Sequence, residues 1–325
     1  MIQKGFWEKL QKPFFALAPM YDVTDAAFRR MIARYSSPDV IFTEFVSADG
    51  LVHPKGQKKL LHHLWFDESE RPIVAQLFGV EPKNFAKAAQ LCRELGFDGV
   101  DINMGCPEKN IVKQGAGAAL IKDPARAKDI IAATIEGASD LPVSVKTRIG
   151  FDKEEIDRWL PHLLENTIAN LTVHLRTRKE MSEVPAHWDL MSRIVQMRND
   201  INRQILLMGN GDVCTIKDGK EKATKTGCDG IMIGRAVFGN PWFFCDYVQK
   251  ISVQERLHVM VEHTRLFAQL FTGVKNFAIM KKHYKAYANG FVDARILRAQ
   301  LMKAHDAQEV EEIVKRFLAN DKKEL

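Results

Sequence analysis

The feature that most constrains the fold of this chain is a series of short apolar segments that alternate with longer amphipathic ones as far as about residue 240. Near-continuous apolar strands separated by helices are typical of a parallel sheet that is covered on both faces. The strand-like segments are 14–20, 40–45, 73–79, 99–103, 143–147, 171–175, 205–209 and 230–234. Eight such units overfill a doubly wound sheet of five or six strands, and they predict an α/β fold of the (β/α)₈ (TIM) barrel type.

Helical patterns occupy several of the intervals between these strands, and they predominate after Pro241. Pro82 and the pair Asp123-Pro124 are typical helix starts, and Gly96 is a typical helix stop. The helices expected between strands are 83–95, 125–138 and 154–164, and those expected after the last strand are 251–271, 277–289 and 294–318. The sequence therefore predicts a barrel domain in residues 1–245 and a small helical domain in residues 246–325.

Composition excludes several classes of protein. The 325 residues include no apolar run long enough to span a bilayer, and the amino-terminal segment lacks the apolar core of a signal peptide. The five cysteines are scattered and include no C-x-x-C pair, which argues against zinc, iron–sulfur and disulfide frameworks. We therefore expect a cytoplasmic protein with no metal site and no membrane partner.

The segment DINMGCP, residues 101–107, places a cysteine where a buried strand is expected to emerge. Gly105 allows the backbone to approach a ligand closely, and Pro107 ends strand pairing. The thiol of Cys106 suits a nucleophile, a general acid or a metal ligand, but a free cysteine is also common as buried packing. The segment alone leaves these alternatives open.

Polar and charged groups stand at the end of almost every predicted strand. The carboxyl ends of barrel strands carry the functional groups of such enzymes, so these side chains are expected at one mouth. The cations Lys146, Arg148, Arg176 and Arg178 follow two neighbouring strands with few compensating acids, a pattern typical of a site for an anionic ligand. Lys146 needs either a carboxylate such as Glu44 or Asp101, or an electron-rich ligand such as a flavin ring edge.

The last two loops indicate a phosphate group. The sequences GNGD, residues 209–212, and IGRAVFGNP, residues 233–241, follow the strands after which barrels commonly bind phosphate. Arg235 would add a charge-assisted contact. Because no G-x-G-x-x-G or Walker sequence occurs, a mononucleotide fits better than a dinucleotide.

A basic segment lies between residues 275 and 303, where seven lysines and arginines stand against the single acid Asp293. The segment is either a solvated helical face or a surface that binds a polyanion. Its aromatic residues could pack in a core or stack on bases; they are Phe277, Tyr284, Tyr287 and Phe291.

Taken together, these motifs resemble the tRNA-dihydrouridine synthase family. The matching segments are APMYDVTDAAFR (18–29), QLFG (76–79), DINMGCP (101–107), SVKTRIG (144–150), HLRTR (174–178), MGNGDV (208–213), DGIMIGRAVFGNPW (229–242) and KKHYKAYANGF (281–291). The resemblance implies an FMN-dependent enzyme that reduces the C5–C6 bond of particular uridines in tRNA, with NADPH as electron donor. It also implies that the helical domain binds tRNA.

The resemblance carries roles to particular residues of this chain. It implies that Cys106 donates a proton to C5 of the uridine. The implied flavin-binding residues are Pro19, Met20, Tyr21, Gln76, Asn103, Lys146 and His174, and those at its phosphate are Asn210, Gly211, Asp212, Gly234 and Arg235. The residues expected to contact tRNA are Arg148, Arg176, Arg178, Lys281, Lys282 and Lys285.

Two positions depart from the family pattern. Members usually have small residues after the Pro-Met pair, where this chain has Tyr21-Asp22, and glycine after the histidine, where this chain has Leu175. Tyr21 is expected to affect the base pocket more than the cofactor. Two other functions stay open: a flavin barrel reductase of a small molecule, similar to dihydroorotate dehydrogenase, and a non-catalytic RNA-binding module.

Overall fold

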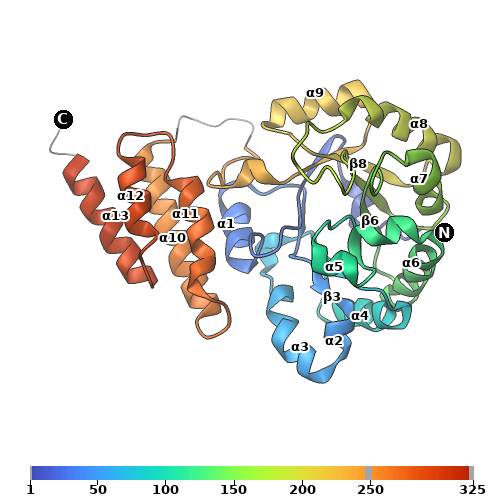
Figure 1. Cartoon of the computed structure of the whole chain (residues 1–325), viewed down its shortest axis with the longest axis horizontal. Helices are drawn as coiled ribbons and strands as arrows, with labels where there is room; N and C mark the ends of the chain where they lie inside the picture. Colours follow the sequence, from blue (N-terminus) through green and yellow to red (C-terminus); the bar gives the residue numbers. More distant parts are fainter. Residues whose placement is uncertain (1, 246–250, 322–325) are drawn as a thin grey trace. The chain divides into compact units, whose positions relative to one another are not determined.

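The computed structural model describes residues 2–245 and 251–321 (Figure 1). By packing, the chain divides into two compact units, which we call the barrel unit and the helical unit. The barrel unit comprises Met1–Thr24 and Pro38–Gly234, and the helical unit comprises Asp25–Ser37 and Arg235–Leu325. The domain boundary expected between residues 245 and 246 lies at the edge of residues 246–250. Those residues are outside the described part of the chain.

The barrel unit contains a parallel sheet that closes on itself. Its order is β2-β1-β9-β8-β7-β6-β5-β4-β3, and a further pairing of β2 with β4 completes the ring. The strands are β1 Phe14–Leu17, β2 Val40–Phe42, β3 Val46–Ser47, β4 Ile73–Phe78, β5 Gly99–Met104, β6 Val143–Arg148, β7 Asn170–His174, β8 Leu206–Asn210 and β9 Gly230–Ile233. The predicted (β/α)₈ barrel is confirmed; the second predicted strand, 40–45, corresponds to β2, and the short strand β3 follows it.

Helices connect the strands of this unit (Figure 1). The helices are α2 Ala48–Val52, α3 Pro54–Leu60, α4 Pro82–Glu94, α5 Lys109–Lys113, α6 Pro124–Ala138, α7 Ile156–Leu164, α8 Met191–Ile201 and α9 Ile216–Thr226. Short 3₁₀ turns are η1 Gly5–Lys9, η2 Leu61–Leu64, η3 Glu68–Glu70, η4 Gly117–Lys122 and η5 Trp188–Leu190. The three helices predicted between strands correspond to α4, α6 and α7. At α6, the side chain of Asp123 accepts the N–H of Arg126 and Pro124 occupies the first turn, as the sequence indicated.

The barrel interior is apolar near the amino ends of some strands and polar elsewhere. Trp7 of η1 packs in a cluster with residues of β1, β2, β4, β8 and β9, among them Phe14, Phe42 and Met208. By contrast, alternate residues of β5 and β6 are polar, including Asp101, Ser144 and Lys146. Because side chains alternate along a strand, these polar residues share one face of the sheet. These strands and their neighbours β4, β7 and β8 carry the candidate site residues Gln76, Asn103, Lys146, His174 and Asn210.

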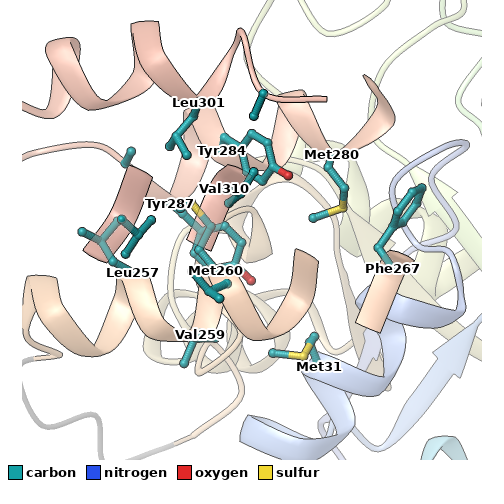
Figure 2. Packing of buried hydrophobic residues seen from close by; sticks show 14 of the residues in the cluster. Met31, Leu257, Val259, Met260, Phe267, Met280, Tyr284, Tyr287, Leu301 and Val310 are labelled. Carbon is teal, nitrogen blue, oxygen red and sulfur yellow. The ribbon is translucent and has the colours of Figure 1, made fainter. Parts of the chain in front are cut away.

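The helical unit has its own core (Figure 2). Its helices are α1 Ala26–Ser36, α10 Val253–Phe271, α11 Lys281–Tyr287, α12 Ala294–Leu301 and α13 Ala307–Asp321, with 3₁₀ turns η6 Arg235–Val237 and η7 Phe277–Met280. Met31 of α1 belongs to the same buried cluster as Met260, Tyr284 and Leu301. The helix between β1 and β2 therefore packs with the carboxyl-terminal helices, although a linear boundary would leave it in the barrel.

Two sequence predictions need correction in the helical unit. The helix expected at 294–318 is two helices, α12 and α13, because Asp306 interrupts the pattern: its side chain accepts the N–H of Glu309 at the start of α13. The helix expected at 277–289 begins with the 3₁₀ turn η7. Within residues 2–245 and 251–321, no helix is both long and apolar enough to cross a membrane.

Candidate active site

The Cys106 loop follows β5 and is held by backbone and side-chain contacts. Asn103 Oδ1 accepts the N–H groups of Gly105 (3.1 Å) and Cys106 (2.9 Å). The carbonyl of Cys106 accepts the N–H of Ala118 at 3.0 Å. A side chain at Gly105 would meet the backbone of Thr147 at 3.2 Å, so the glycine permits this close approach of the loop to β6. Hydrogen bonds to Asn103 and Ala118 and close packing against β6 therefore hold the loop in place.

The thiol of Cys106 is partly exposed. Burial raises its pKa above the ordinary value, while a backbone hydrogen bond from Glu108 and the charge of Arg148 oppose that rise. The thiol is consequently protonated at neutral pH. A protonated thiol at the end of a barrel strand is suited to donate a proton rather than to attack as a thiolate.

Lys146 on β6 is a half-buried ammonium group with a neutral partner. Its Nζ donates to Asn210 Oδ1 at 3.1 Å, and Asn210 Nδ2 donates in turn to the carbonyl of Met232 at 2.8 Å. Burial lowers the pKa of Lys146 to about 8, and the charge of Arg148 lowers it further, while Asp101 raises it. Among the described residues, neither Glu44 nor Asp101 forms an ion pair with it, so the carboxylate alternative raised by the sequence is not realised as a direct contact.

Arg148 and Arg176 bind groups of the protein itself. Arg148, only 6% exposed, donates to the carbonyls of Gly105 (2.8 Å), Thr177 (2.9 Å) and Met181 (2.9 Å). Arg148 thereby ties the Cys106 loop to the loop after β7. The expected contact of Arg148 with tRNA is therefore not supported by its position.

Arg176, only 2% exposed, is engaged in the same way. It forms an ion pair with Asp212, lies 3.1 Å from His174 Nε2, and donates to the carbonyl of Val184 at 2.6 Å. A phosphate contact from Arg176 is not supported either. Arg178 differs: it is half-buried, with its guanidinium over the ring of Phe151.

The loop after β8 contains two successive residues with positive φ. Gly211 has a φ of +127°, and Asp212 follows with a φ of +48°. The indole N–H of Trp188 donates to the carbonyl of Gly211 at 2.7 Å, and the carboxylate of Asp212 is paired with Arg176. These contacts direct the loop's carbonyl and carboxylate groups toward protein partners. An anion could therefore approach the backbone N–H groups with less repulsion.

The second predicted phosphate loop spans the division between the two units. Gly234 ends the barrel unit, and Arg235 begins both η6 and the second segment of the helical unit. A Cβ added at Gly234 would make ordinary van der Waals contacts with Met20 Sδ (3.7 Å) and Ala18 Cβ (3.9 Å).

The loop after β1 carries Pro19, Met20 and Tyr21. The N–H of Met20 donates to Thr24 Oγ1 at 2.9 Å, and the N–H of Asp22 donates to Glu44 Oε1 at 2.6 Å. Tyr21 is 52% exposed, and its ring lies 5.5 Å from that of Phe45 and 5.7 Å from that of His63.

The buried pair of Glu44 and His63 beneath this loop was not predicted. Glu44 Oε2 lies 3.1 Å from His63 Nδ1, and both side chains are almost fully buried. The sequence signal was the LLHHLW segment, residues 60–65, in which two histidines stand in an apolar run.

The basic segment of the helical unit divides into exposed and buried parts. Lys282 and Lys285 on α11 are exposed and Lys281 is partly exposed, whereas the side chain of Lys275 is buried near Asp25. Tyr284 and Tyr287 are fully buried in the core shown in Figure 2, which decides between packing and base stacking for these two rings. In the described residues, no three His, Cys, Asp or Glu side chains form a cluster that could hold a metal ion.

A closed parallel barrel whose strand ends carry a thiol and a half-buried ammonium, together with a helical unit, defines an enzyme of the (β/α)₈-barrel class. The model of the dihydrouridine synthase family matches residues 16–322. A probable tRNA-dihydrouridine synthase of Staphylococcus aureus (strain MRSA252) is 41% identical over 320 residues, covering 98% of this chain and 97% of that protein. Probable tRNA-dihydrouridine synthase 2 of Bacillus subtilis (strain 168) is 42% identical over 316 residues, covering 97% of each.

The chain therefore belongs to the dihydrouridine synthase family, as the sequence motifs indicated, and it is an oxidoreductase of that family. Among solved structures, an old yellow enzyme homologue from Zymomonas mobilis is 14% identical, with a TM-score of 0.48, covering 76% of this chain and 92% of that one. Similarity this weak adds nothing to the family assignment.

Proposed function

We propose that this protein is a cytoplasmic tRNA-dihydrouridine synthase that reduces the C5–C6 bond of particular uridines, using FMN and NADPH. The observation that carries the proposal is the placement of the Cys106 thiol on a loop that Asn103 and Arg148 hold next to β6, the strand of Lys146, in a chain of the dihydrouridine synthase family. The relatives described above carry the tRNA activity in their names. Their match over nearly the whole chain supports the same substrate here.

The polar interior of the barrel fits a flavin. Lys146 is a half-buried ammonium that donates to one neutral acceptor, Asn210, and such a group is stabilised by an electron-rich ring edge. A bound reduced flavin would supply hydride to C6 of the uridine. Gln76, Asn103 and His174 would lie around the polar edge of the ring, and the loop of Pro19, Met20 and Tyr21 would border it.

The two loops after β8 and β9 would hold the phosphate of the mononucleotide. Gly211 gives the loop after β8 a positive φ of +127°, and the absence of a side chain at Gly234 would let an anion approach the backbone of the loop after β9 closely. Asn210 and Asp212 would contribute through the same loop, and Arg235 through its charge.

Cys106 would complete the reduction by protonating C5. Addition of hydride to C6 leaves negative charge spread over C5 and the C4 carbonyl of the base, and a nearby acid must neutralise it. Burial keeps the thiol protonated at neutral pH, so it is ready to donate. The resulting thiolate would be stabilised by the positive charges of Arg148 and Lys146.

Recognition of tRNA would use cations of both units that are at least partly exposed. Lys281, Lys282 and Lys285 are placed to contact phosphates, and Arg178 is the barrel-unit arginine that remains a candidate. The target uridine must leave its stack to reach the barrel interior, at a cost of a few kcal/mol that such contacts would offset.

The test uses the purified full-length protein, NADPH and unmodified tRNA transcripts. We expect a yellow protein that oxidises NADPH and forms dihydrouridine, measured by mass spectrometry of the digested nucleosides. NADPH oxidation coupled to a small molecule such as orotate, with no dihydrouridine in tRNA, would support the small-molecule reductase instead. A colourless protein that binds tRNA would support the RNA-binding module.

A further inference from the structure

A continuous hydrogen-bonded chain runs across three strands of the barrel to the Cys106 loop. Ser144 Oγ and Gln76 Nε2 both donate to the carboxylate of Asp101, at 2.6 and 2.7 Å. Asn103 Nδ2 donates to Gln76 Oε1 at 2.9 Å, and Asn103 Oδ1 accepts the two loop N–H groups described above. Gln76, Asp101 and Ser144 are partners in the strand register, so the sheet itself sets them side by side.

The ends of this chain are chemically fixed, whereas its middle is not. The backbone N–H groups of Gly105 and Cys106 can only donate, and the ionised carboxylate of Asp101 can only accept. Each amide between them has an oxygen end and a nitrogen end that a half-turn of the side chain exchanges. Only one orientation of Gln76 and one of Asn103 gives every donor in the chain an acceptor.

We infer that Asp101 is a positioning residue, which sets the orientation of Gln76 and Asn103 and through them holds the Cys106 loop in place for proton donation. The inference rests on the proposed function of Cys106, because it assigns Asp101 a part in that same reaction. Asp101 is fully buried and bonds to Ser144 and Gln76, so its side chain contacts neither the loop nor the substrate directly.

Burial makes this arrangement sensitive to the acceptor at position 101. Asp101 and Gln76 are fully buried, so water cannot replace a missing partner. Burial raises the pKa of Asp101 to about 6, while the bonds from Ser144 and Gln76 and the charge of Lys146 oppose that rise. The carboxyl is therefore still ionised near neutral pH.

The test compares two substitutions. In Asp101→Leu the branched shape is kept and the acceptor is removed, so Gln76 Nε2 has no partner and the amide chain no longer has a single orientation. In Asp101→Asn the side-chain oxygen can still accept from Gln76, because the Ser144 hydroxyl can reverse and accept from the new amide nitrogen. We expect kcat for tRNA reduction to fall about 10- to 100-fold in Asp101→Leu and less in Asp101→Asn, with KM for tRNA nearly unchanged.

A second readout needs no substrate. Alkylation of Cys106 by iodoacetamide, followed peptide by peptide in the full-length protein, reports the exposure and pKa of its thiol. Cys214 is exposed and serves as an internal reference. We expect the rate at Cys106 relative to Cys214 to rise several-fold in Asp101→Leu and less in Asp101→Asn, with the alkylation pH midpoint moving down.

The matched control is Asp229→Asn. Asp229 is a buried carboxylate at the amino end of β9, bound by Arg198 and by the N–H of Leu207, so its replacement lowers stability without touching the amide chain. The control should leave Cys106 alkylation at the wild-type rate. Unchanged Cys106 reactivity in both Asp101 variants would overturn the inference, as would an equal change in Asp229→Asn. If Asp101→Leu does not fold, Asp101→Asn against Asp229→Asn decides by the same criterion. Dihydrouridine formation by the wild-type protein separately decides the proposed function.

Discussion

Each unit contains a group of buried polar side chains, and the two groups differ in how their polar atoms are paired. In the barrel unit, Asp101, Gln76 and Asn103 form a chain in which donors and acceptors match from end to end. In the helical unit, His263 and His283 are fully buried, and within the described part of the chain neither ring nitrogen of either residue has a hydrogen-bond partner. The first arrangement uses polarity to fix geometry next to a candidate reaction centre.

The second arrangement uses histidine as an aromatic ring. His283 is stacked on Phe28 at 5.3 Å and on Phe238 at 6.0 Å, and it meets His263 edge-on at 4.8 Å. Burial lowers the pKa of His263 to about 3, and burial together with nearby positive charge lowers that of His283. A network in which every donor has an acceptor fixes the geometry of its members. Buried histidines without hydrogen-bond partners make the stability of the helical unit depend on pH.

The largest expected effect comes from removing a buried, hydrogen-bonded side chain of the barrel unit. Arg148→Ala removes three hydrogen bonds from a buried guanidinium and leaves the carbonyls of Gly105, Thr177 and Met181 without that donor. We expect the free energy of unfolding to fall by about 3 kcal/mol or more, measured by urea denaturation. Arg148→Lys, the control, keeps a positive charge but cannot reproduce the three-way fork, so it should recover little of the stability. Wild-type stability in Arg148→Ala would mean that these bonds contribute nothing.

A smaller effect on the free energy of unfolding is expected when the pH is lowered, because of the two buried histidines of the helical unit. The unfolded chain binds a proton at each histidine below pH 6.5, whereas the folded helical unit does not, so stability falls as pH drops from 6.5 toward 3. Each histidine should cost roughly 1 kcal/mol for each pH unit in that window. Urea unfolding of the full-length protein at pH 7.5 and 5.5 measures the decrease.

Substitution of one buried histidine should sharpen this result. His283→Phe keeps the stacking on Phe28 and removes the proton site, so we expect it to reduce the pH dependence of stability by about half. His305→Phe, at an exposed position, is the control and should leave the dependence as in the wild type. Equal slopes in wild type and His283→Phe would show that the buried ring has no part in the acid response.

The smallest expected effect is on tRNA binding by exposed lysines, which belong to neither buried group. Lys282→Glu with Lys285→Glu should weaken tRNA binding several-fold. The slope of log affinity against log salt should become less steep, by about one for each phosphate that the variant no longer neutralises. The comparison is Lys87→Glu with Lys128→Glu, which makes the same change in net charge on exposed residues of α4 and α6. Affinity measured by filter binding at several salt concentrations should distinguish the two double variants. Equal weakening in both would mean that the lysines of α11 act only through the net charge of the protein.

The sequence predicted the barrel well because its signal is local. Most strands are short apolar runs with glycine, proline or aspartate directly beside at least one end, and helices such as α6 begin at a capping residue followed by proline. The strand ends follow from topology alone, so Cys106 and Lys146 could be placed at one rim before any coordinates were known.

What the sequence could not predict depends on partners distant along the chain. Arg148 and Arg176 have the sequence pattern of free cations, yet their acceptors are carbonyls and a carboxylate on other loops, which no spacing rule indicates. The grouping of α1 with α10 to α13 likewise depends on an apolar face whose partners come more than 200 residues later.

The central claim is that Cys106 donates the proton that completes reduction of uridine in tRNA. The most direct measurement is a single turnover, in which pre-reduced wild-type protein and Cys106→Ala are each mixed with unmodified tRNA and flavin reoxidation and dihydrouridine are followed together. We predict normal flavin content in the variant and a decrease of about 10²-fold or more in the rate of tRNA reduction, with Cys214→Ala at the wild-type rate. Wild-type reduction of tRNA by Cys106→Ala would contradict the claim.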